Sequence, residues 1–158
     1  MTEIIRHAEA SSVARVTAPI YLLLFPIPVV LFSTAFVTDI AYAKSANVMW
    51  LNFSEWLIAA GLAFGVLAAI VLIVEFCASR AIRAGVGWAH LVLFFAALVV
   101  ELFNMFIHTR DGWTAVVPTG MTLSILGVLL ALCAVGTLFR VPLKRVTYRE
   151  VTYREALP

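Results

Sequence analysis

Four long apolar runs constrain this chain more than any other feature of its sequence. They cover residues 18–41, 53–77, 87–107 and 115–139, and a membrane-spanning helix needs about 20 predominantly apolar residues. Hydrophobic residues make up 63% of the 158-residue chain and charged residues only 13%, whereas a soluble domain has about 25% charged residues. A core of this size cannot hold so much apolar surface, so lipid must cover the rest. The sequence predicts an all-α, four-transmembrane-helix bundle in contact with a lipid bilayer.

The connectors between the apolar runs are short and carry turn and capping signals. Asn52 and Glu55 have the spacing of a capping box at the start of the second helix. Gly85 and Gly87 mark the turn between the second and third helices, and Pro118 suits the first turn of the fourth. Helices joined by short loops are antiparallel neighbours, so we expect up-down-up-down topology in one bundle.

The distribution of lysine and arginine predicts the orientation of the bundle. Two of these residues precede the first span, two lie between the second and third, and five follow the fourth, whereas the other connectors hold only Lys44 and Arg110. Because cytoplasmic loops are enriched in lysine and arginine, we expect both termini to be cytoplasmic. The predicted parts are an N-terminal segment (1–17), the transmembrane domain (18–139) and a basic tail with a repeated VTYRE sequence (140–158).

Polar residues follow one face of the third apolar run. With about 100° per residue in a helix, Glu101, Asn104 and His108 all lie within about 40° of His90. A charged group near the centre of a bilayer costs several kcal/mol, so we expect this face to point into the bundle. It is either a proton relay or polar ligand site, or a set of side chains that hold helices together by hydrogen bonds. We favour the second interpretation.

Small residues line one face of each of two other runs. Those of the fourth run are Gly120, Ser124, Gly127, Ala131 and Ala134. Those of the second run are Gly61, Gly65 and Ala69. Small residues let helices approach closely. We therefore expect the face on the fourth run to meet the polar face of the third.

Other charged residues lie near the ends of the runs. Glu75 is expected to pair with Arg80 or Arg83 at the inner end of the second run. Asp39 ends the first run, and we expect it to belong to a polar cluster at the outer surface whose members solvate the loops and pair with one another. That cluster comprises Asp39, Glu55, His108, Arg110 and Asp111.

Two prolines interrupt the first run. Pro26 and Pro28 lack the backbone N–H group and leave the carbonyls of Leu22 and Leu24 unpaired, which predicts a kink. Broken helices with unpaired carbonyls form substrate sites in transporters. Structural bends without such a role are the commoner case.

The sequence contains no motif that indicates catalysis. It has no glycine-rich phosphate loop, nucleophile elbow, HExxH or CxxC, and a net charge of +2 is too small to indicate nucleic acid. We predict no catalytic residue, no metal and no cofactor. His90 and His108 share one helix, and His7 precedes the first span. A bis-histidine haem, which needs histidines on facing helices, is therefore not expected from this chain alone.

Several short motifs nevertheless occur together. They are Phe25-Pro26-Ile27, Thr38-Asp39, Trp56 with Gly61, Glu75-Phe76, Gly87-Trp88-Ala89-His90, and a run from Asn104 to Ser124 that reads N…RDGW.AV.P.G..LS. Over residues 18–135 the sequence resembles the bacterial predicted inner-membrane proteins grouped as domain-of-unknown-function family 2231. The resemblance implies a four-span bundle without a settled biochemical function. Relatives fused to, or encoded near, c-type cytochrome and quinoprotein dehydrogenase components imply a respiratory or periplasmic redox context.

The chain departs from the family pattern at two places. Many members have a histidine where this chain has Leu24, and many end the last span with a Gly-Trp-Leu-Gly-Gly-type sequence where this chain has Cys133-Ala134-Val135-Gly136. If histidines on the first and third spans hold a haem in some members, this chain lacks one of them.

Three functions are compatible with these features. The first is a non-catalytic subunit, anchor or ligand-binding bundle, which acts as a homo-oligomer or with another membrane or redox protein. The second is a small oligomeric transporter or proton-conducting protein that uses Glu101, Asn104, His108 and the broken first helix. The third is a haem- or quinone-linked electron-transfer protein that uses His90.

Overall fold

Apolar segments in lipid must pair their backbone polar groups internally, which favours helices. The computed structural model describes residues 19–110 and 112–139. Its elements are α1 (Pro19–Leu24), α2 (Pro26–Ser45), α3 (Val48–Ala78), α4 (Arg80–His108), the short 3₁₀ helix η1 (Gly112–Ala115) and α5 (Thr119–Phe139). The described residues contain no strand. The predicted all-α, four-helix fold is confirmed, while the side of the membrane on which the termini lie stays a prediction.

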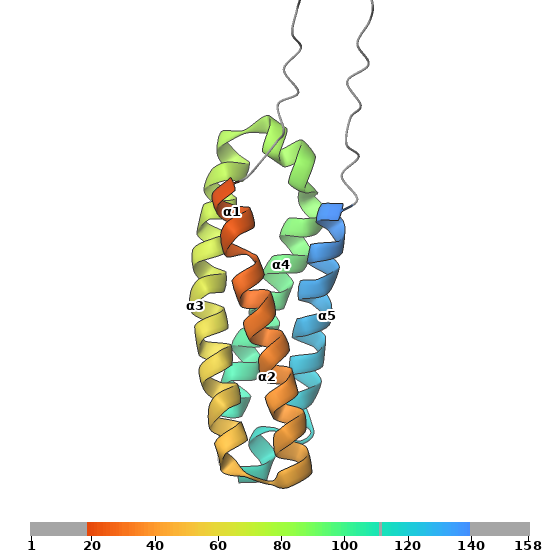
Figure 1. The fold of residues 1–158 in the computed structure, drawn as a ribbon. Coiled ribbons are helices and arrows are strands. Elements are labelled where there is room, and N and C mark those ends of the chain that lie inside the picture. The colour runs from red at the N-terminus through yellow and green to blue at the C-terminus, as the bar shows by residue number, and fades with distance from the viewer. Residues whose placement is uncertain (1–18, 111, 140–158) are drawn as a thin grey trace, which may run out of the picture. The chain divides into compact units, whose positions relative to one another are not determined.

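The four long helices lie side by side in a closed arrangement (Figure 1). Helix α3 packs against α2 and α4, and α5 packs against α4 and α2. Each connector leads to an adjacent, antiparallel helix, so the topology is up-down-up-down. Helix α1 continues the line of α2 and lies against α3.

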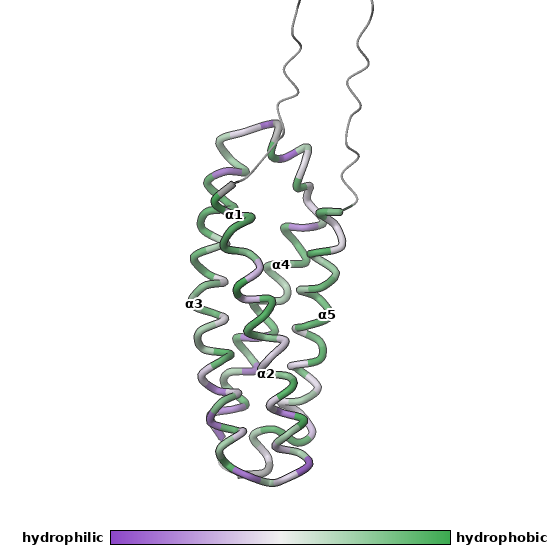
Figure 2. The backbone as a smooth tube through the Cα atoms, viewed as in Figure 1, coloured by the Kyte–Doolittle hydropathy of each residue, from purple (hydrophilic) through white to green (hydrophobic). Residues whose placement is uncertain are grey.

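All four helices are long and apolar enough to cross a membrane. The candidate spans are Ile20–Ser45, Val48–Ala78, Ile82–His108 and Thr119–Phe139. Figure 2 shows that hydrophobic residues dominate their lengths and that hydrophilic residues gather toward the ends of the bundle. Large apolar side chains on every long helix, such as Val30, Val74, Phe106 and Leu129, are more than half exposed in the isolated chain. Lipid is the medium that would cover them.

Helix α3 begins earlier than the predicted capping box at Asn52 and Glu55, and that prediction is wrong. The cap is Asn47, whose Oδ1 accepts a hydrogen bond from the backbone N–H of Met49 at 3.0 Å. Ala46 before it has φ 51°, so a tight turn joins α2 to α3. The first turn of α3 includes the apolar Val48, so the helix begins before residue 53, where the predicted second span begins.

The turn between α3 and α4 lies at Ser79, which separates the two helices. The Oγ of Ser79 accepts from the backbone N–H of Ile82 at 3.4 Å. Gly87, predicted as part of a turn, has φ 77°, a backbone conformation that glycine adopts without strain. It bends α4 after the first segment of that helix. Figure 1 shows the chain crossing from α3 to the rest of α4 through that segment, at one end of the bundle.

The prolines separate α1 from α2. Helix α1 ends at Leu24 and α2 begins at Pro26, yet Phe25 keeps helical angles and its N–H bonds to the carbonyl of Tyr21 at 2.8 Å. The interruption is therefore a kink in one membrane crossing, as Pro26 predicts. Helix α1 lies against α3, and Tyr21 is fully buried, with its ring beside His90 and Phe94 of α4.

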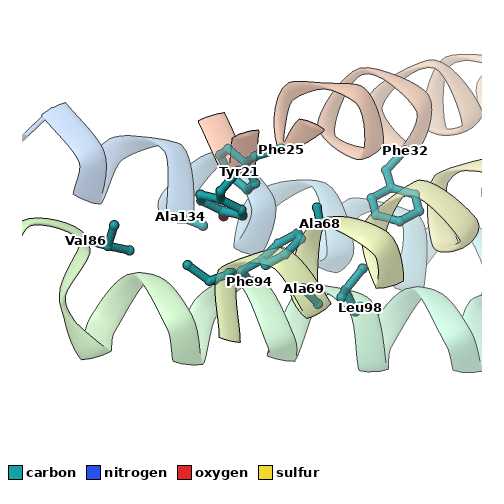
Figure 3. Close-up of a cluster of buried hydrophobic side chains, with 10 residues drawn as sticks. Tyr21, Phe25, Phe32, Ala68, Ala69, Val86, Phe94, Leu98 and Ala134 are labelled. Carbon is teal, nitrogen blue, oxygen red and sulfur yellow. The ribbon is translucent and has the colours of Figure 1, made fainter. Parts of the chain in front are cut away.

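The apolar core combines large side chains with very small ones. Its members are Tyr21, Phe25, Phe32, Ala68, Ala69, Leu72, Val86, Phe94, Leu98 and Ala134, most of which are labelled in Figure 3. A Cβ atom at Gly61 would overlap the ring of Phe32, and one at Gly65 would overlap the side chain of Leu98. The small residues of α3 are therefore the places where α2 and α4 approach it.

Candidate polar site in the bundle core

The four residues of the predicted polar face of α4 are all buried. Glu101 is 1% exposed, and His90, Asn104 and His108 are 0% exposed. They separate into two groups along the helix. Glu101, Asn104 and His108 meet Asp39 and Ser124, and these five residues form what we name the acid–histidine cluster. His90 lies nearer the other end of α4 and has different partners.

A continuous set of hydrogen bonds joins three helices in the acid–histidine cluster. On α2, Asp39 follows the buried Ala35 by one turn, and its Oδ1 lies 2.9 Å from Nε2 of His108. Its Oδ2 accepts from Oγ of Ser124 on α5 at 2.5 Å. The amide Nδ2 of Asn104 donates to Oγ of Ser124 at 2.8 Å and to Oε2 of Glu101 at 3.0 Å. Residues far apart in the sequence thus lock α2, α4 and α5 together.

The donors and acceptors fix most proton positions in this cluster. Ser124 gives its only proton to Asp39, so its oxygen must accept from Asn104, which sets the orientation of that amide. His108 Nδ1 faces the backbone carbonyl of Asn104 at 3.0 Å and must donate to it. One further proton lies between His108 Nε2 and Asp39 Oδ1. Whichever atom holds it, the Asp39–His108 pair has no net charge.

The small face of α5 makes room for these side chains. Gly120, Ser124, Gly127, Ala131 and Ala134 are all buried. A Cβ atom at Gly120 would lie 2.9 Å from Cε1 of His108, and one at Gly127 would overlap Oε1 of Glu101. The predicted contact between the small face of the fourth span and the polar face of the third is confirmed.

His90 belongs to a second group, the Tyr21–His90 cluster, which also contains Thr137. Its Nδ1 lies 2.9 Å from the carbonyl of Ala134 and 3.0 Å from Oγ1 of Thr137. Thr137 donates its own proton to that carbonyl at 2.6 Å, so Nδ1 carries a proton and donates. Nε2 of His90 then accepts from the hydroxyl of Tyr21. Both ring nitrogens are hydrogen-bonded.

Aromatic rings surround this second cluster. The ring of Phe25 lies 5.0 Å from that of His90 and 5.1 Å from that of Phe94, measured between centroids. Figure 3 shows Tyr21, Phe25 and Phe94 together near Ala134. Tyr21 is not predicted as a site residue from the sequence, because a tyrosine near the end of an apolar run is typical of an interfacial residue. Thr38 and Ser54 are not predicted either, and their hydroxyl oxygens lie 2.7 Å apart between α2 and α3.

An apolar layer separates the two clusters. Glu101 follows His90 by eleven residues, a rise of about 16 Å along a helix. Phe94, Ala97 and Leu98 are buried between them. The side-chain hydrogen bonds of the described residues leave this gap unbridged.

The remaining predicted site residues lie elsewhere. Arg110 is exposed beyond the end of α4, and Asp111 lies outside the described residues. Within the described chain, the predicted outer cluster therefore contributes one ion pair, that of Asp39 and His108. Glu55 is half-buried on α3 and interacts electrostatically with His108.

The predicted pairing of Glu75 with Arg80 or Arg83 is wrong. Arg83 instead donates from Nη1 to the carbonyls of Phe76 and Cys77, at 2.7 and 3.0 Å. The last carbonyls of a helix have no partner within it, and they attract the guanidinium that follows the turn. Oε2 of Glu75 is buried without a hydrogen-bond partner.

Neither cluster is arranged as a metal site, and neither lines the two surface hollows at α3 and at the α1–α2 kink. Among the described residues, no group of three or more His, Cys, Asp or Glu side chains could hold a metal ion. One hollow on the surface lies beside Asn52 and Trp56 of α3. Another lies between the α1–α2 kink at Pro26 and the end of α5 at Phe139, and its lining is almost wholly apolar.

Four apolar helices around a buried polar interior define a multi-pass membrane protein. A family model described as "Predicted membrane protein (DUF2231)" matches residues 17–138, and the chain belongs to this family. The resemblance found in the sequence is therefore confirmed. No curated protein and no solved structure matches the chain.

Proposed function

We propose that the protein is a non-catalytic bundle of the bacterial inner membrane that serves as a subunit or anchor of a larger membrane assembly. The observation that supports this function is that most of the buried polar groups form hydrogen bonds within the bundle itself. Asp39, Asn104, His108 and Ser124 are all engaged with side chains or backbone of neighbouring helices. Side chains used in this way hold helices together.

The exterior supports the same proposal. The exposed surface of the helices is apolar on every long helix, and one hollow of that surface lies at the α1–α2 kink. Such a surface suits lipid or the helices of a partner. We infer a homo-oligomer or a complex with another membrane protein, for which the family resemblance favours a redox component.

The alternatives fit the geometry less well. A proton path through one chain would have to cross the apolar layer of Phe94, Ala97 and Leu98. A haem held by His90 would displace the hydroxyl of Tyr21 from Nε2. Within residues 19–110 and 112–139, no second histidine faces His90. The described residues therefore do not fit a bis-histidine haem.

Purification in mild detergent tests the proposed function. The protein mass of the complex, measured by light scattering with the detergent subtracted, should exceed that of one chain and should correspond to a fixed stoichiometry. A strict monomer recovered from several mild detergents would contradict the proposal. The absorption spectrum of the same sample should lack a Soret band, and a stoichiometric band would favour the electron-transfer hypothesis instead.

The proposed orientation, with both termini cytoplasmic, predicts a labelling pattern. Lys44 and Ala84 are both exposed, near opposite ends of the bundle. In a chain with Cys77→Ser and Cys133→Ser, we expect Lys44→Cys to react with a membrane-impermeant maleimide on intact spheroplasts. Ala84→Cys should react only after lysis. The reverse pattern would invert the proposed topology.

A further inference from the structure

Glu101 holds one of the least satisfied polar groups in the described core. Its side chain is 1% exposed, and Oε2 accepts from Asn104 at 3.0 Å. Its other oxygen, Oε1, is buried and has no hydrogen-bond partner. Oδ1 of Asn104, three residues along the same helix, is likewise buried and unpartnered. Leaving such acceptors unpaired costs roughly 1–3 kcal/mol each, and more for a charged group.

Among the described residues, the cationic group that acts on Glu101 is His108, and its charge is already engaged. On α2 the nearby group is Asp39, close enough to repel a second negative charge. On α4, His108 is already balanced by Asp39. On α3 the titratable group that interacts with His108 is Glu55, which is also acidic. Helix α5 has no charged residue between Thr119 and Phe139.

The packing also excludes a larger ligand at Oε1. Gly127 of α5 lies so close that a Cβ atom added there would overlap this oxygen. A metal ion or an ordered water between Oε1 and Gly127 would need the helices to separate. A proton needs almost no space. It also neutralises the negative charge of the carboxylate, whose uncompensated burial costs several kcal/mol.

We infer that Glu101 is a proton-binding site, and that in the folded bundle it is a neutral carboxylic acid with its proton on Oε1. Oε2 stays the acceptor of the Asn104 amide. The site is formed by α2, α4 and α5 together, and it holds one proton per chain. This inference does not depend on the proposed role as a subunit or anchor, because it concerns the folded chain alone.

Infrared spectroscopy of the full chain in lipid nanodiscs at neutral pH tests the inference. A protonated carboxylic acid has a carbonyl stretch that carboxylates lack. The wild type should show this band, and Glu101→Gln should lose it. Glu75→Gln, which removes another carboxylate with a buried unpartnered oxygen, is the matched control and should retain it. Replacing sodium by choline should leave the band unchanged.

Three outcomes would overturn the inference. The band could be absent from the wild type, it could persist in Glu101→Gln, which would place the proton on Asp39 or another group, or it could appear only without sodium, which would indicate a bound cation. If Glu101→Gln does not fold, the wild type labelled with ¹³C at the glutamate carboxyls provides the same test by solid-state NMR. One glutamic acid signal should then be in the protonated form at neutral pH, and its absence would contradict the inference.

Discussion

Replacing Asp39 with alanine is expected to destabilise the bundle by about 3 to 5 kcal/mol, the cost of breaking a buried ion pair by removing one partner. His108 would stay fully buried with Nε2 unpaired, and Ser124 would lose its acceptor. Interhelical hydrogen bonds in membranes average only about 0.6 kcal/mol, so the pair and not the individual bonds accounts for the size of the effect. The free energy of unfolding can be measured by SDS titration from mixed micelles.

Two further variants separate the pair from general damage to the fold. Lys44→Ala, also on α2 but exposed, should change the free energy of unfolding by less than about 0.5 kcal/mol. Asp39→Ala combined with His108→Ala should be less destabilising than the sum of the two single changes by at least about 1 kcal/mol. Additive effects, or a loss below about 1 kcal/mol for Asp39→Ala, would show that the two residues do not form a coupled buried pair.

Gly127→Val is the second substitution with a large expected effect, a loss of about 1 to 3 kcal/mol from overpacking. Its side chain would occupy the space of Glu101 Oε1 and push α5 away from α4. The matched control is Gly136→Val on the same helix, where an added Cβ meets no atom within 4 Å. The same unfolding titration applies to both variants.

A compensating change tests whether the clash with Glu101 is the cause. Glu101→Ala shortens the side chain that Gly127→Val would meet. Gly127→Val should therefore lower the free energy of unfolding less in the Glu101→Ala background than in the wild type. Equal losses for Gly127→Val and Gly136→Val would contradict the packing described for α4 and α5. So would a double variant without any recovery.

The helices and their mutual faces were predictable because membrane burial leaves a strong periodic signal. The polar stripe from His90 to His108 and the small stripe from Gly120 to Ala134 have matching spacing. The polar stripe must avoid lipid, and the small stripe leaves empty space unless another helix fills it, so the two faces are expected to meet. The match of the family model to residues 17–138 then supports the motifs by which the family was recognised.

The partners within the core were less accessible to sequence reasoning. Periodicity gives the face on which His90 lies but not the depth at which another helix presents a hydroxyl. Tyr21 reaches His90 from a segment that the Pro26 kink separates from α2. Arg83 binds helix-end carbonyls instead of Glu75, because unpaired carbonyls compete with carboxylates for a guanidinium. Such choices depend on three-dimensional proximity, which neither spacing nor composition contains.

The placement of the polar face of α4 inside the bundle is most directly tested by NMR in nanodiscs that contain a spin-labelled lipid. The rings of Phe103 and Phe106, which are 60% and 61% exposed, should broaden strongly because the lipid chains contact them. The side-chain amide of Asn104 and the ring of His108, both 0% exposed, should keep narrow signals. Broadening of Asn104 equal to that of Phe103 would place the polar face against lipid and contradict the structure described for this protein.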